Sequence, residues 1–134
     1  MALCTTDALR AYARMMNTLD VKHIAPLLAE DFHYSSQWVF AEITSKQEYL
    51  DYIRPKLEAI AKSGAKVYAE MAVHDGWGGD PCVVMAQGSP SNLVATVLAK
   101  VSDGQITRLD MGMLPAPEEA TRSGEYPGRT CIPR

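Results

Sequence analysis

The sequence has few cysteines, and their placement argues against a cross-linked or metal-bound chain. Three occur among 134 residues, Cys4, Cys82 and Cys131, an odd number without any short spacing. Disulfide frameworks need paired cysteines, and zinc sites need closely spaced cysteine or histidine ligands. No pair of histidines has metal-ligand spacing either. We therefore expect no metal, no other cofactor and a reducing, cytoplasmic environment.

Basic runs and long apolar runs are missing as well. The formal net charge is −3, and no run of Lys or Arg forms a stripe that could follow a phosphate backbone. No apolar stretch approaches the roughly 20 residues that a membrane-spanning helix needs. The first residues lack the basic start and apolar core of a signal peptide. These absences predict no nucleic-acid partner and no membrane partner.

The first half of the chain does contain helical periodicity. Apolar residues recur at helical spacing over residues 5–18 and again over residues 45–64. Ser45 and Glu48 are typical of a capping box, Gly64 supplies a stop, and Pro55 predicts a kink.

A third, shorter helix is expected from Asp20 to Leu28, with a possible break at Pro26.

After Gly64 the apolar period changes to two, which is typical of strands. Together with an earlier alternating stretch, the predicted strands are residues 31–40, 66–74, 81–88, 93–101 and 105–114. Turns are predicted at residues 76–80 and 102–104. Separate helical and strand regions predict an α+β domain over residues 1–114, with three N-terminal helices packed on one face of a mostly antiparallel sheet. Residues 115–134, rich in proline, are predicted to be an irregular tail, disordered or laid over the fold.

Two local segments carry a resemblance to a known superfamily. Residues 27–32, Leu-Leu-Ala-Glu-Asp-Phe, lead into the first strand, and residues 102–108, Ser-Asp-Gly-Gln-Ile-Thr-Arg, form the last hairpin. These two segments, together with the order of the predicted helices and strands, make residues 5–114 resemble the nuclear transport factor 2-like superfamily. It includes SnoaL-like polyketide cyclases, ketosteroid isomerases, limonene epoxide hydrolase and many domains without known activity. The fold alone assigns no function.

The resemblance implies a strongly curved sheet that forms a cone, with an internal cavity covered by the helices. By analogy, the ligand-binding residues would come from the first helix and from the inward parity of three strands. They are Tyr12, Met16, Tyr34, Ser36, Trp38, Val97, Leu109, Met111 and Met113. Such a cavity suits a small, mostly apolar ligand held by one or two hydrogen bonds.

The catalytic groups of a ketosteroid isomerase are mostly absent. Tyr12 matches the position of that family's oxyanion tyrosine, but the base position falls on Ser36 and the protonated acid near Val97. Serine has no useful basicity at neutral pH and valine donates nothing, so we reject this chemistry.

Other polar pairs also have structural interpretations. Arg108 and Asp110 show the Arg-x-Asp pattern of limonene epoxide hydrolase, but they lie in the wrong strand. Strand alternation directs both side chains away from the cavity, so we expect them to form an ion pair in solvent or at an interface. His74 and Cys82 would pair across a hairpin, yet strand parity points His74 outward. His33 is expected at an interface.

Three functions follow as hypotheses. The first is binding of a small, largely apolar molecule in the cavity. The second is a cyclase, isomerase or hydratase that uses Tyr12 or Tyr34 as a hydrogen-bond donor, which would need Glu42, Asp51 or Glu70 turned into the cavity. The third is an interaction module that forms a homodimer through the outer sheet face, where Val94, Thr96 and Leu98 are predicted to lie. Homodimer formation is compatible with the other two.

Overall fold

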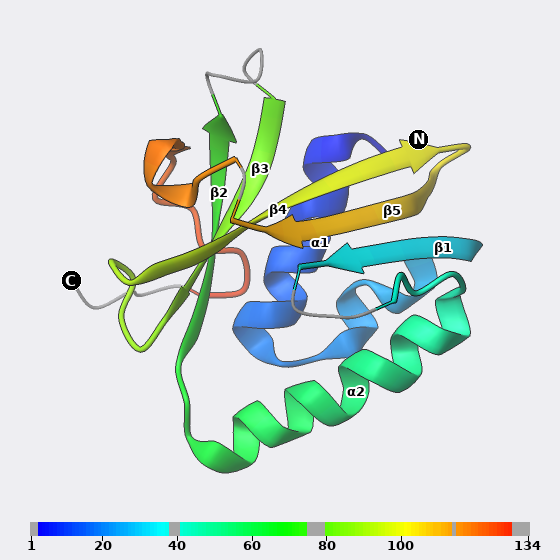
Figure 1. Cartoon of the computed structure of the whole chain (residues 1–134), viewed down its shortest axis with the longest axis horizontal. Coiled ribbons are helices and arrows are strands. Elements are labelled where there is room, and N and C mark those ends of the chain that lie inside the picture. The colour runs from blue at the N-terminus through cyan, green and yellow to red at the C-terminus, as the bar shows by residue number, and fades with distance from the viewer. Residues whose placement is uncertain (1–2, 38–40, 75–79, 114, 130–134) are drawn as a thin grey trace.

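A computed structural model describes residues 3–37, 41–74, 80–113 and 115–129 (Figure 1). Two α-helices, three 3₁₀ turns (η) and six strands are described. In chain order they are α1 (Thr5–Thr18), η1 (Val21–His23), η2 (Ala25–Leu27), β1 (Leu28–Ser36), α2 (Lys46–Ser63), β2 (Val67–His74), β3 (Asp80–Gln87), β4 (Leu93–Ser102), β5 (Gln105–Gly112), η4 (Pro117–Glu119) and β6 (Thr121–Arg122). Trp38 and the predicted turn at 76–79 lie outside the described residues. Neither α-helix is long and apolar enough to cross a membrane.

The strands form one mixed sheet in the order β1-β5-β4-β3-β2-β6. Strands β2 to β5 make the predicted antiparallel meander, whereas β1 pairs with β5 in parallel. At the predicted hairpin, Ser102 pairs with Gln105, and both Asp103 and Gly104 adopt left-handed backbone angles (φ 53° and 72°). A two-residue turn in which both residues have left-handed backbone angles matches the twist of the flanking strands.

The helices pack on one face of this sheet, which confirms the α+β class. In Figure 1 the strand direction changes from nearly vertical in β2 and β3 to nearly horizontal in β1 and β5, so the sheet is strongly curved. Helix α1 packs on β2, β3 and β4, and α2 packs on β1. The main core lies between these helices and the concave face of the sheet.

Helix α2 begins and ends at the predicted residues. The Ser45 hydroxyl accepts a hydrogen bond from the Glu48 backbone N–H at 3.1 Å, which caps the first turn. Gly64 has a φ of 73° and ends the helix, because glycine adopts this conformation without a steric penalty. The helix continues through Pro55, whose side chain is exposed.

The segment predicted as a short helix from Asp20 to Leu28, with a possible break at Pro26, forms two separate 3₁₀ turns and not one α-helix. The Asp20 carboxylate accepts from the Lys22 N–H at 3.0 Å and caps a single 3₁₀ turn, η1. Pro26 stands in the first turn of η2, and Leu28 is already extended as the first residue of β1. Proline has no N–H for an α-helical hydrogen bond and clashes with the preceding turn, so the segment forms two short turns.

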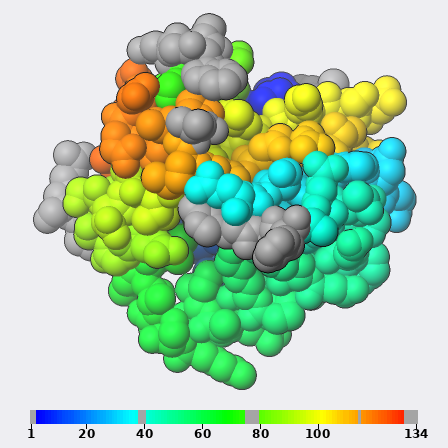
Figure 2. All heavy atoms as spheres, in the orientation of Figure 1, coloured from blue at the N-terminus to red at the C-terminus, as the bar shows by residue number. Residues whose placement is uncertain are grey.

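Residues 115–129 cover part of the convex, outer face of the sheet and then reach α1, where the Asn17 side chain donates to the Pro127 carbonyl oxygen at 2.8 Å. Strand β6 adds a sixth strand beside β2, and η4 lies next to β4. A second apolar cluster forms beneath this segment, made of Ala72, Cys82 and Val84 with Leu93, Leu98 and Ala120. In Figure 2 the orange atoms of this segment form part of the molecular surface beside the strands.

His74 was expected to point outward, and it does lie on the outer face. However, it is only 3% exposed, because its Nε2 lies 3.1 Å from the carbonyl oxygen of Ala116 in the covering segment. Its direct partner across the hairpin is Asp80, whereas Cys82 pairs with Ala72. The predicted His74–Cys82 pair is therefore wrong.

Val94 also departs from its predicted outward position. The pairing of β3 with β4 shifts between Met85 and Ala86, so that Met85 pairs with Ala95 but Ala86 pairs with Leu93. Val94 falls in this β-bulge, which turns its side chain toward the main core.

Candidate functional site

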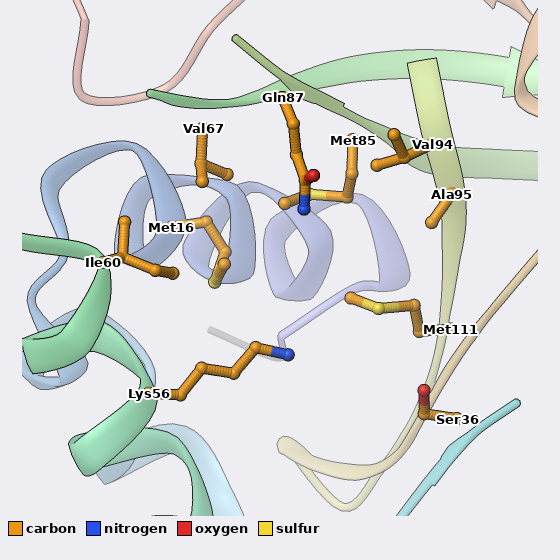
Figure 3. A pocket seen from close by; sticks show the side chains of 10 residues that line it. All are labelled: Met16, Ser36, Lys56, Ile60, Val67, Met85, Gln87, Val94, Ala95 and Met111. Atoms are coloured by element: carbon orange, nitrogen blue, oxygen red, sulfur yellow. The ribbon is translucent and has the colours of Figure 1, made fainter. Parts of the chain in front are cut away.

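A cavity of about 420 Å³ lies between the helices and the concave face of the sheet. Both α-helices and all five long strands contribute side chains to its wall (Figure 3). The lining residues are Met16, Ser36, Lys56, Ile60, Val67, Met85, Gln87, Val94, Ala95 and Met111. Its volume falls within the range of about 300–1,000 Å³ that is usual for small-molecule sites.

Most of the cavity wall is apolar. Met16, Met85 and Met111 bring three thioether side chains to it from α1, β3 and β5, and Figure 3 shows them on two sides of the hollow. Met16 and Met85 are buried, at 4% exposure each. Methionine side chains are flexible and polarizable, so this wall can adjust to apolar molecules of different shapes.

Three polar side chains point into the hollow in Figure 3, those of Ser36, Lys56 and Gln87. Lys56 and Gln87 are exposed and lie at its mouth, whereas Ser36 is buried. The Lys56 ammonium donates to the Tyr52 hydroxyl at 3.2 Å and stands 5.4 Å from the centre of that ring. These two contacts hold the ammonium at the mouth of the cavity.

Four tyrosines pack behind the wall between α1, α2 and β1. The Tyr34 ring lies 5.2 Å from Tyr49 and 5.7 Å from Tyr52, and its hydroxyl donates to the Met111 sulfur at 3.8 Å. Burial raises the pKa of Tyr12, Tyr34 and Tyr49 above the usual range for tyrosine. These phenols therefore stay protonated and can act as hydrogen-bond donors, but not as bases.

The carboxylates proposed as possible bases have other partners. Glu42 pairs with Arg108 at 2.6 Å and with His33 at 2.8 Å, and Asp51 accepts from Gln47 at 2.9 Å on the surface of α2. Glu70 is buried against the covering segment, where Arg122 and others bind it. None of the described residues that line the cavity is Asp, Glu or His.

The outer sheet face instead carries an ion-pair network. Arg108 pairs with both Glu42 and Asp110, the latter at 3.0 Å, and His33 joins through Glu42. Arg108 and, after it, His33 lower the pKa of the Glu42 carboxyl. All four side chains are partly exposed, so Arg108 and Asp110 form the predicted ion pair on the side of the sheet away from the cavity.

Nucleophilic chemistry at Cys82 is not supported. The side chain is fully buried, and burial raises the pKa of its thiol to about 11. The thiolate, which is the reactive form, is therefore scarce at neutral pH. Within the described part of the chain, no three His, Cys, Asp or Glu side chains group as metal ligands.

The predicted ligand-binding residues are distributed between the cavity and the core. Met16, Ser36 and Met111 line the cavity. Tyr12, Val97 and Leu109 are buried in the core, and Tyr34 touches the cavity residue Met111 from behind. Met113 is 39% exposed, and Trp38 lies outside the described residues.

Sequence reasoning placed Ala95 on the cavity face but missed six lining residues, above all Lys56. It lies four residues from both Tyr52 and Ile60, which places all three on one side of α2, next to the apolar stripe. The available signal was a lysine that shares a helix face with the partly buried Tyr52 and Ile60. The nearby Gln87 ends β3 and gave no comparable signal, because only the packing of α2 brings it close to the cavity.

Comparison with known proteins identifies the fold. No protein-family model and no curated protein matches the sequence. Among solved structures, a nuclear transport factor 2 (NTF2)-like protein of unknown function from Cytophaga hutchinsonii is similar, with a TM-score of 0.58 and 16% identity over 83% of this chain and 90% of that one. The chain has the NTF2-like fold.

Two further structures with this fold have names that suggest chemistry. A candidate polyketide cyclase from Sinorhizobium meliloti is similar at a TM-score of 0.54 and 22% identity, covering 78% of this chain and 93% of that one. A candidate ketosteroid isomerase from Kribbella flavida is similar at a TM-score of 0.56 and 20% identity, covering 97% of this chain and 91% of that one. At such identities the NTF2-like fold is shared, and its chemistry has to be argued from the residues of each chain.

Proposed function

We propose that this NTF2-like domain binds a small, largely apolar molecule in the cavity between α1, α2 and the sheet. The observation that carries the proposal is a cavity of about 420 Å³ whose wall is mostly methionine and aliphatic side chains. A hollow of this kind binds apolar surface well and leaves orientation to a few polar groups.

Binding is favoured over catalysis by the chemistry of the wall. Proton transfer in cyclases or isomerases needs a base placed beside the substrate. Among the described lining residues, Lys56 is the sole titratable side chain, and the nearby phenols are held protonated by burial. Glu42, Asp51 and Glu70 are all engaged elsewhere. Among the described residues, the enzyme alternative therefore has no base placed in the cavity.

The test uses the methionines as reporters. With the methionine methyl groups labelled by ¹³C, addition of neutral apolar probes such as 1-octanol should shift the NMR signals of Met16, Met85 and Met111. Met113, exposed and away from this wall, serves as the internal control. Equal shifts at all methionines, or none at the three lining residues, would contradict the proposal.

A filling substitution sharpens this test. Ala95 lines the cavity from β4, and Ala95→Phe should occupy the space and abolish the shifts with 1-octanol. Ala99→Phe is the matched control, because Ala99 lies on the same strand but not on this wall. Both variants need a normal folded spectrum for the comparison. Persistent binding by folded Ala95→Phe would place the ligand elsewhere.

A further inference from the structure

The mouth of the cavity carries the positive charge of Lys56, which pairs with no acidic side chain among the described residues. Within the described ranges, Lys56 has no carboxylate at ion-pairing distance, whereas Arg10 and Arg108 each pair with two carboxylates and Arg122 pairs with one. The Lys56 ammonium is nevertheless held in place by the Tyr52 hydroxyl and ring. Figure 3 shows it directed across the hollow, toward the side where Met111 and Ser36 lie.

This ammonium belongs to a row of polar groups along one wall. Burial, and after it Tyr52, raises the pKa of the Tyr34 hydroxyl, whereas Ser36 lowers it, so these three side chains act on one another along this wall. The row runs from the exposed mouth at Lys56 to the buried hydroxyl of Ser36, while the opposite wall is built from Val67, Met85 and other apolar side chains. Such a site distinguishes the two ends of a ligand: one end meets the cation and the other meets the thioethers.

We infer that the cavity selects an apolar molecule that bears one carboxylate, with the carboxylate at Lys56 and the hydrocarbon part against Met16, Met85 and Met111. The inference rests on the proposed function and specifies its ligand class. Gln87, on the other side of the hollow, adds an amide group to the lining.

A single carboxylate suits these donors better than a phosphate does. Phosphate sites commonly combine an Arg fork, several backbone N–H groups or a helix N-terminus. Here the donors in the lining are one ammonium, one amide and the Ser36 hydroxyl, and Lys56 lies in the middle of α2 (Lys46–Ser63), away from its N-terminus. A charge-assisted hydrogen bond to one ammonium is enough to hold a carboxylate that keeps part of its hydration at an open mouth.

The test compares octanoate with 1-octanol, which share a hydrocarbon chain and differ in the head group. We expect the full chain to bind octanoate about tenfold more tightly than 1-octanol, as measured by calorimetry and by the methionine methyl shifts. Lys56→Gln should lose that advantage, about tenfold for octanoate, and leave 1-octanol binding unchanged. Lys62→Gln removes the same charge from an exposed position of α2 that does not line the cavity, and it should bind both probes as the unchanged chain does.

The possible failures are distinguishable. If 1-octanol binds at the three methionines as tightly as octanoate does, the inference is overturned while the proposed apolar binding stands. If Lys62→Gln weakens octanoate as much as Lys56→Gln does, the attraction is a general effect of charge and the inference also falls. If neither probe binds, both the inference and the proposed function are wrong.

Discussion

Glu70 shows at the scale of one residue how the end of the chain is fixed to the sheet. Its side chain is 4% exposed, and it accepts hydrogen bonds from Arg122 Nε at 2.6 Å, the Gly124 N–H at 2.7 Å and the Tyr126 hydroxyl at 3.1 Å. A buried carboxylate is tolerated only with partners of this kind. Three donors from residues 122–126 therefore meet one acceptor on β2.

Replacing this acceptor should destabilise the protein without changing the shape of the side chain. We expect Glu70→Gln to lower the free energy of unfolding by about 2 kcal/mol, because it removes charge-assisted hydrogen bonds and turns an NH₂ group toward donors. Urea denaturation measures the change. Glu125→Gln is the control, since Glu125 pairs with Arg10 at an exposed position. This variant should lower the free energy of unfolding by well under about 1 kcal/mol. Equal losses in the two variants would contradict this account of Glu70.

The limits of sequence reasoning at this scale are seen in Lys56 and Ser36. Strand alternation correctly predicted the inward position of Ser36, because parity is a local property. The position of Lys56 over the mouth depends on how α2 packs against the sheet, which one helix pattern does not specify.

Among the elements, β1 and β5 are joined by side chains as well as by their parallel ladder. Glu42, just before the Ile43 bridge to β1, binds Arg108 of β5 and His33 of β1. Because Arg108, and then His33, lower the folded-state pKa of Glu42, the contribution of Glu42 to stability is complete above the ordinary glutamate pKa. It is lost as the pH falls through the depressed folded value.

This linkage predicts a pH-dependent effect of Glu42→Gln. At neutral pH the variant should melt at a lower temperature than the unchanged chain, because it lacks the charge that binds Arg108 and His33. The two melting temperatures should converge in acid, where Glu42 is protonated and uncharged. Thermal unfolding followed by circular dichroism over a pH series measures this. A difference that is constant over the series would show that the charge of Glu42 contributes nothing.

Elements with strong local signals were predicted well, and those set by tertiary packing were not. The capping contact of Ser45 and the left-handed Gly64 gave α2 its true ends. The segment after Asp20 has helical spacing, but Pro26 and the start of β1 at Leu28 prevent an α-helix. The bulge at Val94 has no glycine or proline to announce it, and only the pairing of β3 with β4 reveals it.

At the scale of the whole molecule, the outer sheet face bears on assembly. The covering segment pairs with β2 and packs beside β4, and Leu98, at the border of the apolar cluster beneath it, remains partly exposed next to Asp110 of β5. A hollow of about 280 Å³ adjoins it, lined in part by Ser35, Thr96 and Asp110. The uncovered part of this face is where we still expect two copies to meet.

The expected assembly is a homodimer at micromolar concentration. Light scattering should give twice the mass of the chain, and Leu98→Glu should reduce it to one chain by placing a charge in the interface. Lys100→Glu, two residues along β4 at an exposed position, is the control for a change of charge alone. A single-chain mass for the unchanged protein would disprove the dimer.

The parallel pairing of β1 with β5 has a consequence for synthesis of the chain. Tyr34 and Ser36 pair with Leu109 and Met111, so β1 receives its partner only after β5 (Gln105–Gly112), about 70 residues further along the chain, has been translated. Until then, its aromatic face has no sheet to join, and the early helices have no complete surface to pack on. A nascent chain paused before β5 is therefore the species most in need of a chaperone.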